Sequence, residues 1–277
     1  MSVQLVDTEQ GVRNLIQEIE ASSLDHPFLF LDLEGVSLGR YGTISILQIL
    51  VPPSPTVHLL DIHVLDKLIF STKSSTGTSL KDILESSKYP KVFFDLRNDS
   101  DALYAHYGVK LSCVVDVQLL EFGTRPRPGR FLKGLAKSIT EDSWLNRQQI
   151  REWQASKELG HDMFDPKKGG SYEVFNHRPL DKAIEEYCAR DVLLLPVLLQ
   201  VYAGRLRGRG ILAAAIQSEA EHRVTRSQRA DFNGRGQHMA IGPVGLGKYS
   251  PKDSKPTFPM SLVVSPDLSK YCALEKN

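Results

Sequence analysis

The chain has 277 residues, of which 41% are hydrophobic and 24% charged, the ordinary composition of a globular protein. It contains no run of about 18 apolar residues, so no membrane span is expected, and its start lacks the apolar stretch of a secretory signal. The three widely spaced cysteines fit neither a disulfide framework nor a zinc site. They favour a reducing, intracellular compartment, nuclear or cytoplasmic.

Charge is unevenly distributed along the chain, although the net charge is only +1. Residues 205–277 hold 12 Lys and Arg against 6 Asp and Glu, whereas residues 1–204 hold 22 against 27. We expect a folded domain at 1–204 and a basic, helical and partly disordered C-terminal extension at 205–277, with little order from about Asn233 onward. The extension is either an electrostatic arm for an anionic partner or a solvated tail without one.

The first part of the chain predicts one helix followed by three strands. Residues 8–21 form an apolar stripe at helical spacing behind Thr8, which can cap the helix. Three short segments rich in apolar and β-branched residues then follow each other closely, at 28–33, 43–51 and 57–61. Their close succession predicts an antiparallel meander.

Helices and strands alternate in the next part of the chain, which predicts that further strands join the sheet in parallel. Turn-rich loops are expected at 123–134 and 162–177. The expected elements are helices at 79–86, 99–107 and 180–202, the last interrupted near Pro196, and strands at 91–94 and 113–116.

Acidic residues stand where these elements would bury apolar ones. Asp32 and Glu34 lie two apart at the end of a predicted buried strand, so they project from the same face. Two carboxylates so placed repel unless a cation lies between them, and oxygen ligands suit Mg²⁺ or Mn²⁺. Asp99 begins a helix, with Leu103 on the same side. The alternative readings are a solvated pair for the first two and a helix-dipole contact for Asp99.

A second helix carries Tyr187 and Asp191 four residues apart, so their side chains point the same way. The flanking residues are mostly apolar, which predicts an aspartate near the interior, where it needs a partner. That partner is either a cation in the site or an ordinary ion pair with Arg178 or Arg190.

Three segments together resemble the motifs of the DEDD exonucleases in the variant with tyrosine, which include ribonuclease D, the Werner-syndrome exonuclease and the nuclear exosome exonuclease. They are FLFLDLEG at 28–35, KVFFDLRNDSDAL at 91–103 and RPLDKAIEEYCARDVLLL at 178–195. The likeness covers roughly 25–204 and is greatest to the subset containing Egalitarian and the exonuclease-domain proteins. At one position the sequence differs from the family pattern: many relatives have His or Asn where this chain has Phe94. The resemblance implies a ribonuclease H-like α/β fold, with a mixed five-stranded sheet flanked by helices.

The resemblance also implies a 3'-5' exonuclease acting on single-stranded nucleic acid, RNA more than DNA, and releasing nucleoside 5'-monophosphates. Two divalent metal ions, Mg²⁺ or Mn²⁺, would be held by Asp32, Glu34, Asp99 and Asp191. Tyr187 would orient or help to deprotonate the attacking water. Neither a membrane nor a particular protein partner is implied.

Residues around these motifs are candidates for substrate contacts. The basic loop at 123–134 carries arginines and a lysine that could contact phosphate or simply be solvated, and its Phe131 could stack on a base or belong to the core. The candidates are Leu33, Gly35, Val36, Leu103, Arg130, Lys133, His177 and Arg178.

Two other functions remain open. The first is a nucleic-acid-binding scaffold of the Egalitarian type that no longer catalyses. The second is a different enzyme with paired acids, such as a glycoside hydrolase, in which the tyrosine and aspartate of the last helix have no role. A nuclease assay with Mn²⁺ on a 5'-labelled single strand separates the scaffold from an exonuclease, and dependence on a metal would exclude the glycoside hydrolase.

Overall fold

The computed structural model describes residues 2–22, 27–127 and 129–246, which fold around one mixed β-sheet. The predicted α/β class is confirmed. Little order is expected from Asn233 onward, but the stretch up to residue 246 is described, and 247–277 lie outside the described residues.

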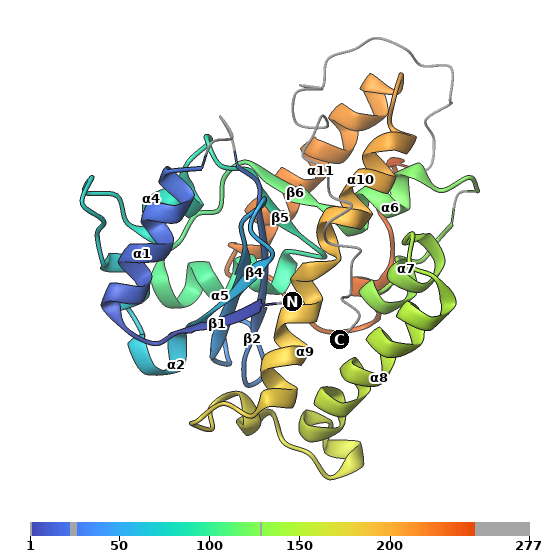
Figure 1. Ribbon diagram of the computed structural model, residues 1–277. Coiled ribbons are helices and arrows are strands. Elements are labelled where there is room, and N and C mark those ends of the chain that lie inside the picture. Colours follow the sequence, from blue (N-terminus) through green and yellow to red (C-terminus); the bar gives the residue numbers. More distant parts are fainter. Residues whose placement is uncertain (1, 23–26, 128, 247–277) are drawn as a thin grey trace.

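Helices lie on both sides of the sheet (Figure 1). Helices α1 (Glu9–Glu20) and α4 (Leu80–Glu85) are on one side, and α9 (Lys182–Leu193) is on the other. Helix α8 (Arg147–Phe164) packs against α9 on its outer side. Because α9 contacts β2, β3 and β4 directly, side chains from this helix and from the middle of the sheet meet.

Six strands form the sheet, in the order β1-β4-β3-β2-β5-β6. β2, β3 and β4 pair antiparallel, as predicted for the meander, and β5 and β6 join β2 in parallel, as predicted for strands alternating with helices. The strands are β1 Ser2–Val6, β2 Leu29–Glu34, β3 Ile46–Leu50, β4 Thr56–Asp61, β5 Lys91–Phe93 and β6 Val114–Asp116.

The sheet has one strand more than the five expected, because the N-terminal residues form β1 along β4. The two strands run parallel, with Ser2 opposite Thr56 and Val6 opposite Leu60. Within β1 only Val6 is buried. So short an edge strand carries too little apolar patterning to be predicted from its sequence.

Several predicted helices are confirmed with their termini. Thr8 caps α1 and accepts a hydrogen bond from the Gly11 amide, and Gly108 ends α5 in the left-handed conformation. The apolar stretch near the end of the folded domain divides at Leu194, with Pro196 in the first turn of α10. The remaining helices are α2 Ile62–Leu65, α3 Leu68–Ser71, α5 Arg97–Tyr107, α6 Val117–Thr124, α7 Leu135–Asp142, α10 Leu195–Arg205 and α11 Gly210–Ser227, with 3-10 turns at Pro166–Lys168, Tyr172–Phe175 and Gln237–Ala240.

No helix is predicted between residues 135 and 161, yet α7 and most of α8 lie there, and α8 continues to Phe164, three residues into the loop expected at 162–177. Among the residues of α8 only Trp153, Gly160 and Phe164 are buried, so its apolar stripe is weak. Its start does carry a signal, because Asn146 and Gln149 form a capping box. Helix α8 carries Lys157, which contacts Asp191 of α9.

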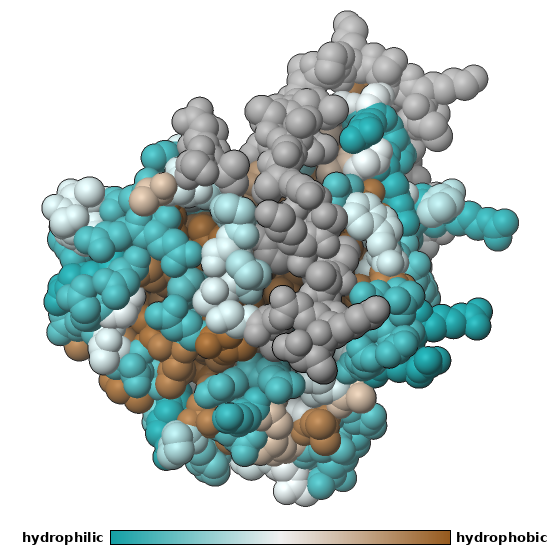
Figure 2. Space-filling model, viewed as in Figure 1, coloured by the Kyte–Doolittle hydropathy of each residue, from teal (hydrophilic) through white to brown (hydrophobic). Residues whose placement is uncertain are grey.

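One stretch, Lys182–Arg205, is long and apolar enough to cross a membrane by length and composition, but 67% of its most apolar window is buried inside the protein. It comprises α9 and α10, which pack on the sheet and on α6. On the face shown in Figure 2, hydrophilic side chains cover most of the described surface. The stretch is therefore a core segment of the fold.

Helix α11 of the predicted extension packs on α5, α6 and β6. Its Arg223 is buried and contacts Asp116 at 2.7 Å and Gln118 at 3.0 Å. At its C-terminal end, Arg40 of the main fold donates hydrogen bonds to the carbonyls of Ser227, Arg229 and Ala230. Residues 210–230 are thus fastened to the body, while the boundary at residue 204 stays a prediction.

Replacing Arg223 by methionine is expected to lower the free energy of unfolding by about 3–5 kcal/mol, because Asp116 would remain buried without its counter-charge. Chemical denaturation followed by circular dichroism measures the effect. Arg226→Met is the matched control, because Arg226 lies on the same helix but is exposed. It should change stability by no more than about 0.5 kcal/mol. Equal losses from the two variants would contradict the role of the buried ion pair.

Candidate functional site

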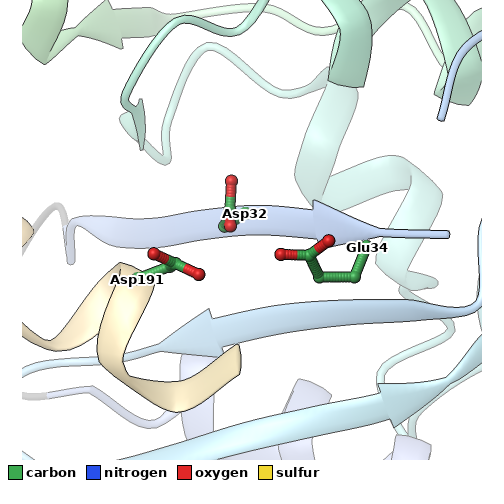
Figure 3. A group of neighbouring side chains, drawn as sticks. All are labelled: Asp32, Glu34 and Asp191. Atoms are coloured by element: carbon green, nitrogen blue, oxygen red, sulfur yellow. The ribbon is translucent and has the colours of Figure 1, made fainter. Parts of the chain in front are cut away.

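Three carboxylates from distant parts of the chain meet at one face of the sheet (Figure 3). Asp32 and Glu34 extend from β2, Asp191 extends from α9, and one oxygen of each lies within 4.8 Å of the others. The strand alternates, so Leu31 and Leu33 enter the core on its other face. The local structure therefore places two acids on the side covered by α9, as the spacing in the sequence predicts.

Asp99 approaches the same place from the first turn of α5. Its side chain is buried, and its Oδ1 atom has no hydrogen-bond partner among the described residues. Its charge acts on both Asp32 and Glu34. A buried carboxylate oxygen without a partner is unfavourable in free energy. Asp99 Oδ1 can therefore still accept a hydrogen bond from a water molecule or bind a cation.

The acids of this cluster raise each other's pKa values. Burial raises the pKa of Glu34 to about 8, with a further contribution from the Asp191 charge. Burial also raises the pKa of Asp99 to about 8, together with the charges of Asp95 and Asp116. The pKa of Asp32 lies well above its usual value, because of burial first and then the charges of Asp191, Asp99 and Glu34. Four charged carboxylates are therefore stable together only when cations accompany them.

A lysine from α8 supplies one positive charge to the cluster. Lys157 Nζ lies 2.5 Å from Asp191 Oδ2 and 3.0 Å from the centroid of the Tyr187 ring. This contact corrects the expectation that an ion-paired Asp191 would use Arg178 or Arg190. Arg178 pairs with Asp61 instead. Lys157 was not predicted as a site residue, because nothing in the sequence relates it to an aspartate in the last predicted helix.

Tyr187 lies one turn before Asp191 on α9 and faces α8. Its ring packs edge-on against Phe164, with centroids 5.0 Å apart. Burial, followed by the nearby Asp191 charge, raises the pKa of its hydroxyl, which therefore stays protonated at neutral pH. Helices α8 and α9 approach closely because residue 160 is glycine, where a Cβ atom would lie 2.5 Å from that of Tyr187. This approach brings Lys157 within reach of Asp191.

Four predicted substrate contacts lie close to the acids along the sequence. Leu33 lies between Asp32 and Glu34, and Leu103 lies one turn after Asp99, both of them buried. Gly35 and Val36 follow the strand directly. A Cβ atom at Gly35 would lie 2.1 Å from the Thr43 carbonyl oxygen, so the backbone can make this turn only with glycine.

The predicted basic contacts differ in whether their charges are free. Arg178 is held by Asp61 and by the Phe175 and His177 carbonyls, and Lys133 pairs with Glu121 at 2.9 Å and with two further acids. Both charges are thus used within the fold. His177 and Arg130 are exposed, and the Arg130 guanidinium lies 5.4 Å from the Phe131 ring centroid.

Of the two alternatives for Phe131, the core position is wrong, since its side chain is 56% exposed. Together with Arg130 it forms an exposed cationic and aromatic pair in the loop that follows α6. Such a pair has the chemistry to stack on a base and to contact a phosphate.

The profile of the 3'-5' exonuclease family matches residues 3–202 of the chain, a range that includes all four acids and Tyr187. No curated protein matches the sequence. Among solved structures, the RNase D of Trypanosoma brucei in complex with GMP is similar, with a TM-score of 0.68 and 20% identity over 92% of this chain and 74% of that one.

Two further structures are similar at lower scores. One is the RNase D of Escherichia coli, an exoribonuclease involved in structured RNA processing, with a TM-score of 0.57 and 20% identity over 83% of this chain and 52% of that one. The other is Brucella melitensis NrnC with bound Mg²⁺, with a TM-score of 0.56 and 19% identity over 85% of this chain and 100% of that one. At these identities the likeness shows a shared fold, which confirms the predicted architecture.

Proposed function

The chain belongs to the 3'-5' exonucleases of the DEDD superfamily, and we propose that it hydrolyses single-stranded RNA from the 3' end to nucleoside 5'-monophosphates. The observation that carries this proposal is the convergence of carboxylates from β2 and α9, with the buried Asp99 of α5 beside them. The acids come from three different elements of the fold, and their mutual repulsion would disfavour such a cluster. A site that binds cations explains why they lie together.

The donor set fits two divalent ions, Mg²⁺ or Mn²⁺. All the ligand atoms are carboxylate oxygens, which these ions prefer. Three of the acids have oxygens within 4.8 Å, and Asp99 contributes an oxygen without a partner. We assign Asp32, Glu34, Asp99 and Asp191 as the residues that would hold the ions. When bound, such ions stabilise the charge on the attacking and leaving oxygens of a phosphodiester displacement.

Tyr187 is assigned to the attacking water. Its hydroxyl stays protonated, because burial and the Asp191 charge raise its pKa. A neutral phenol both donates and accepts a hydrogen bond, so it can orient a water molecule without gaining a charge in an acidic site. The ring is held for this task by Phe164 and by the close approach of Gly160.

The choice of RNA is supported by a structure to which this chain is similar. The similar T. brucei RNase D has been solved with GMP and with the RNA U12. The exposed pair Arg130 and Phe131, in the loop that follows α6, would supply charge and a stacking surface without selecting a base sequence. We place the reaction inside the cell, nuclear or cytoplasmic, where the free thiols of Cys113 and Cys188 remain reduced.

One observation favours a second function, a scaffold that binds RNA without cleaving it. The Lys157 ammonium occupies one oxygen of Asp191, and a chain in which this pair persisted would not load a metal there. The cleavage assay below distinguishes the two functions.

A 5'-labelled single-stranded RNA, a DNA of the same sequence and a circular RNA test the proposal. With Mn²⁺ or Mg²⁺ we expect the linear RNA to shorten progressively from its 3' end and the circle to stay intact, and a chelator should stop the reaction. Chromatography of the products should show nucleoside 5'-monophosphates. If the linear strand is not shortened with Mn²⁺ present, the exonuclease proposal is wrong and the scaffold function is favoured. Cleavage of the circle would indicate an endonuclease.

A further inference from the structure

We propose that the Lys157 ammonium is an internal counter-cation of the acidic cluster, which a divalent ion must displace from Asp191 in order to load the site. This inference rests on the proposed metal site and assigns to this lysine control over how tightly that site binds its metal.

The contact between lysine and aspartate is close and shielded from water. Nζ lies 2.5 Å from Asp191 Oδ2, and the two side chains are only 15% and 9% exposed. The ammonium charge acts on Asp32 and Glu34 as well. Lys157 is therefore placed among the proposed metal ligands and is not a surface charge that happens to lie nearby.

A lysine and a divalent ion cannot share this carboxylate comfortably. A carboxylate oxygen binds Mg²⁺ at about 2.0–2.1 Å. An ion on Asp191 Oδ2, which lies 2.5 Å from Nζ, would therefore be no more than about 4.6 Å from the ammonium at its present position. Charges of +1 and +2 at that separation repel strongly in a site with little water. Loading a metal on this oxygen thus requires that the ammonium withdraw from Asp191 Oδ2.

The structure offers the displaced ammonium other partners. Nζ lies over the face of the Tyr187 ring and 3.4 Å from the Tyr187 carbonyl oxygen, and both partners are neutral. Lysine has a flexible four-carbon stem, so a small rotation can break the contact with Asp191 and keep the contact with the ring. Lys157 can therefore release Asp191 while it keeps its neutral partners.

Titration calorimetry of the full chain with Mn²⁺, without nucleic acid, tests this role in the wild type and in Lys157→Met. Removing the competing cation is expected to tighten Mn²⁺ binding at least about tenfold. Lys168→Met is a matched control, since Lys168 also lies 2.5 Å from an aspartate, Asp162, in an exposed pair away from the cluster. It should bind Mn²⁺ as the wild type does.

Thermal unfolding gives a second readout that does not depend on activity. In a chelator, Lys157→Met should unfold at a lower temperature than the wild type, because the acids lose their counter-cation, and Mn²⁺ should raise its Tm by more than it raises that of the wild type. Lys157→Gln, neutral but polar, provides the same comparison if the methionine variant does not fold.

Unchanged or weaker Mn²⁺ binding in the neutral variants would overturn the counter-cation role while leaving the metal site in place. No Mn²⁺ binding by any of the proteins would overturn both the inference and the proposed function.

Discussion

Replacing Asp32 by alanine is expected to lower exonuclease activity at least about a thousandfold, equivalent to roughly 4 kcal/mol of transition-state stabilisation. Asp32 lies at the centre of the cluster, where the charges of Asp191, Asp99 and Glu34 all act on it. Without it, the assigned ions lose a ligand on which the charges of the three other acids all act. The measurement is kcat/KM on a 5'-labelled RNA at saturating Mn²⁺.

The fold should survive this change. Removing one carboxyl from a cluster of acids relieves repulsion, so circular dichroism and the midpoint of chemical unfolding should match those of the wild type or exceed them. Asp162→Ala is the control, because Asp162 is an exposed acid of α8 outside the cluster. It should keep full activity. A normally active Asp32→Ala enzyme would refute the assignment of the site.

The central sheet could be predicted because its strands are short, apolar and separated by clear turns. Leu29–Glu34 and Ile46–Leu50 are almost wholly buried, and such runs distinguish strands from their surroundings. The edge strand Ser2–Val6 could not be predicted, because its stability comes from pairing with β4 and only one of its side chains is buried. A strand that is stabilised mainly by pairing with its neighbour cannot be recognised from its own few residues.

The grouping of Asp32, Glu34 and Asp191 could be expected from the sequence, because each is a carboxylate among mostly apolar neighbours. Asp99 carries a weaker signal, since an aspartate is common in the first turn of a helix.

The use of the basic residues could not be predicted. Arg178 is a plausible phosphate contact in sequence, but it is held by Asp61, 117 residues away, and Lys157 meets Asp191 across 34 residues. The type of a charged residue shows that it needs a partner, whereas only the fold shows which partner it has.

Raising the pH from 6 to 8 is expected to strengthen Mn²⁺ binding by about a hundredfold or more. Metal ligands must be deprotonated, and the pKa values of Glu34 and Asp99 are both raised to about 8 in the metal-free protein. Below that pH each bound ion displaces protons, and every proton displaced makes the affinity rise about tenfold per pH unit. Calorimetry at pH 6, 7 and 8 measures the slope, which should level off above about pH 8.

The stability of the metal-free protein should change in the opposite direction. Glu34 and Asp99 have higher pKa values in the folded chain than their usual 4.5 and 3.8, so the folded state holds protons that the unfolded state has released. Their contribution is fully present below about pH 4 and is lost as the pH rises toward about 8. Asp99→Asn should reduce both slopes, because one of the two titrating acids is removed. If Mn²⁺ affinity and metal-free stability were both flat between pH 6 and 8, these carboxyls would already be ionised without a metal, and the cluster would have no need of the cations assigned to it.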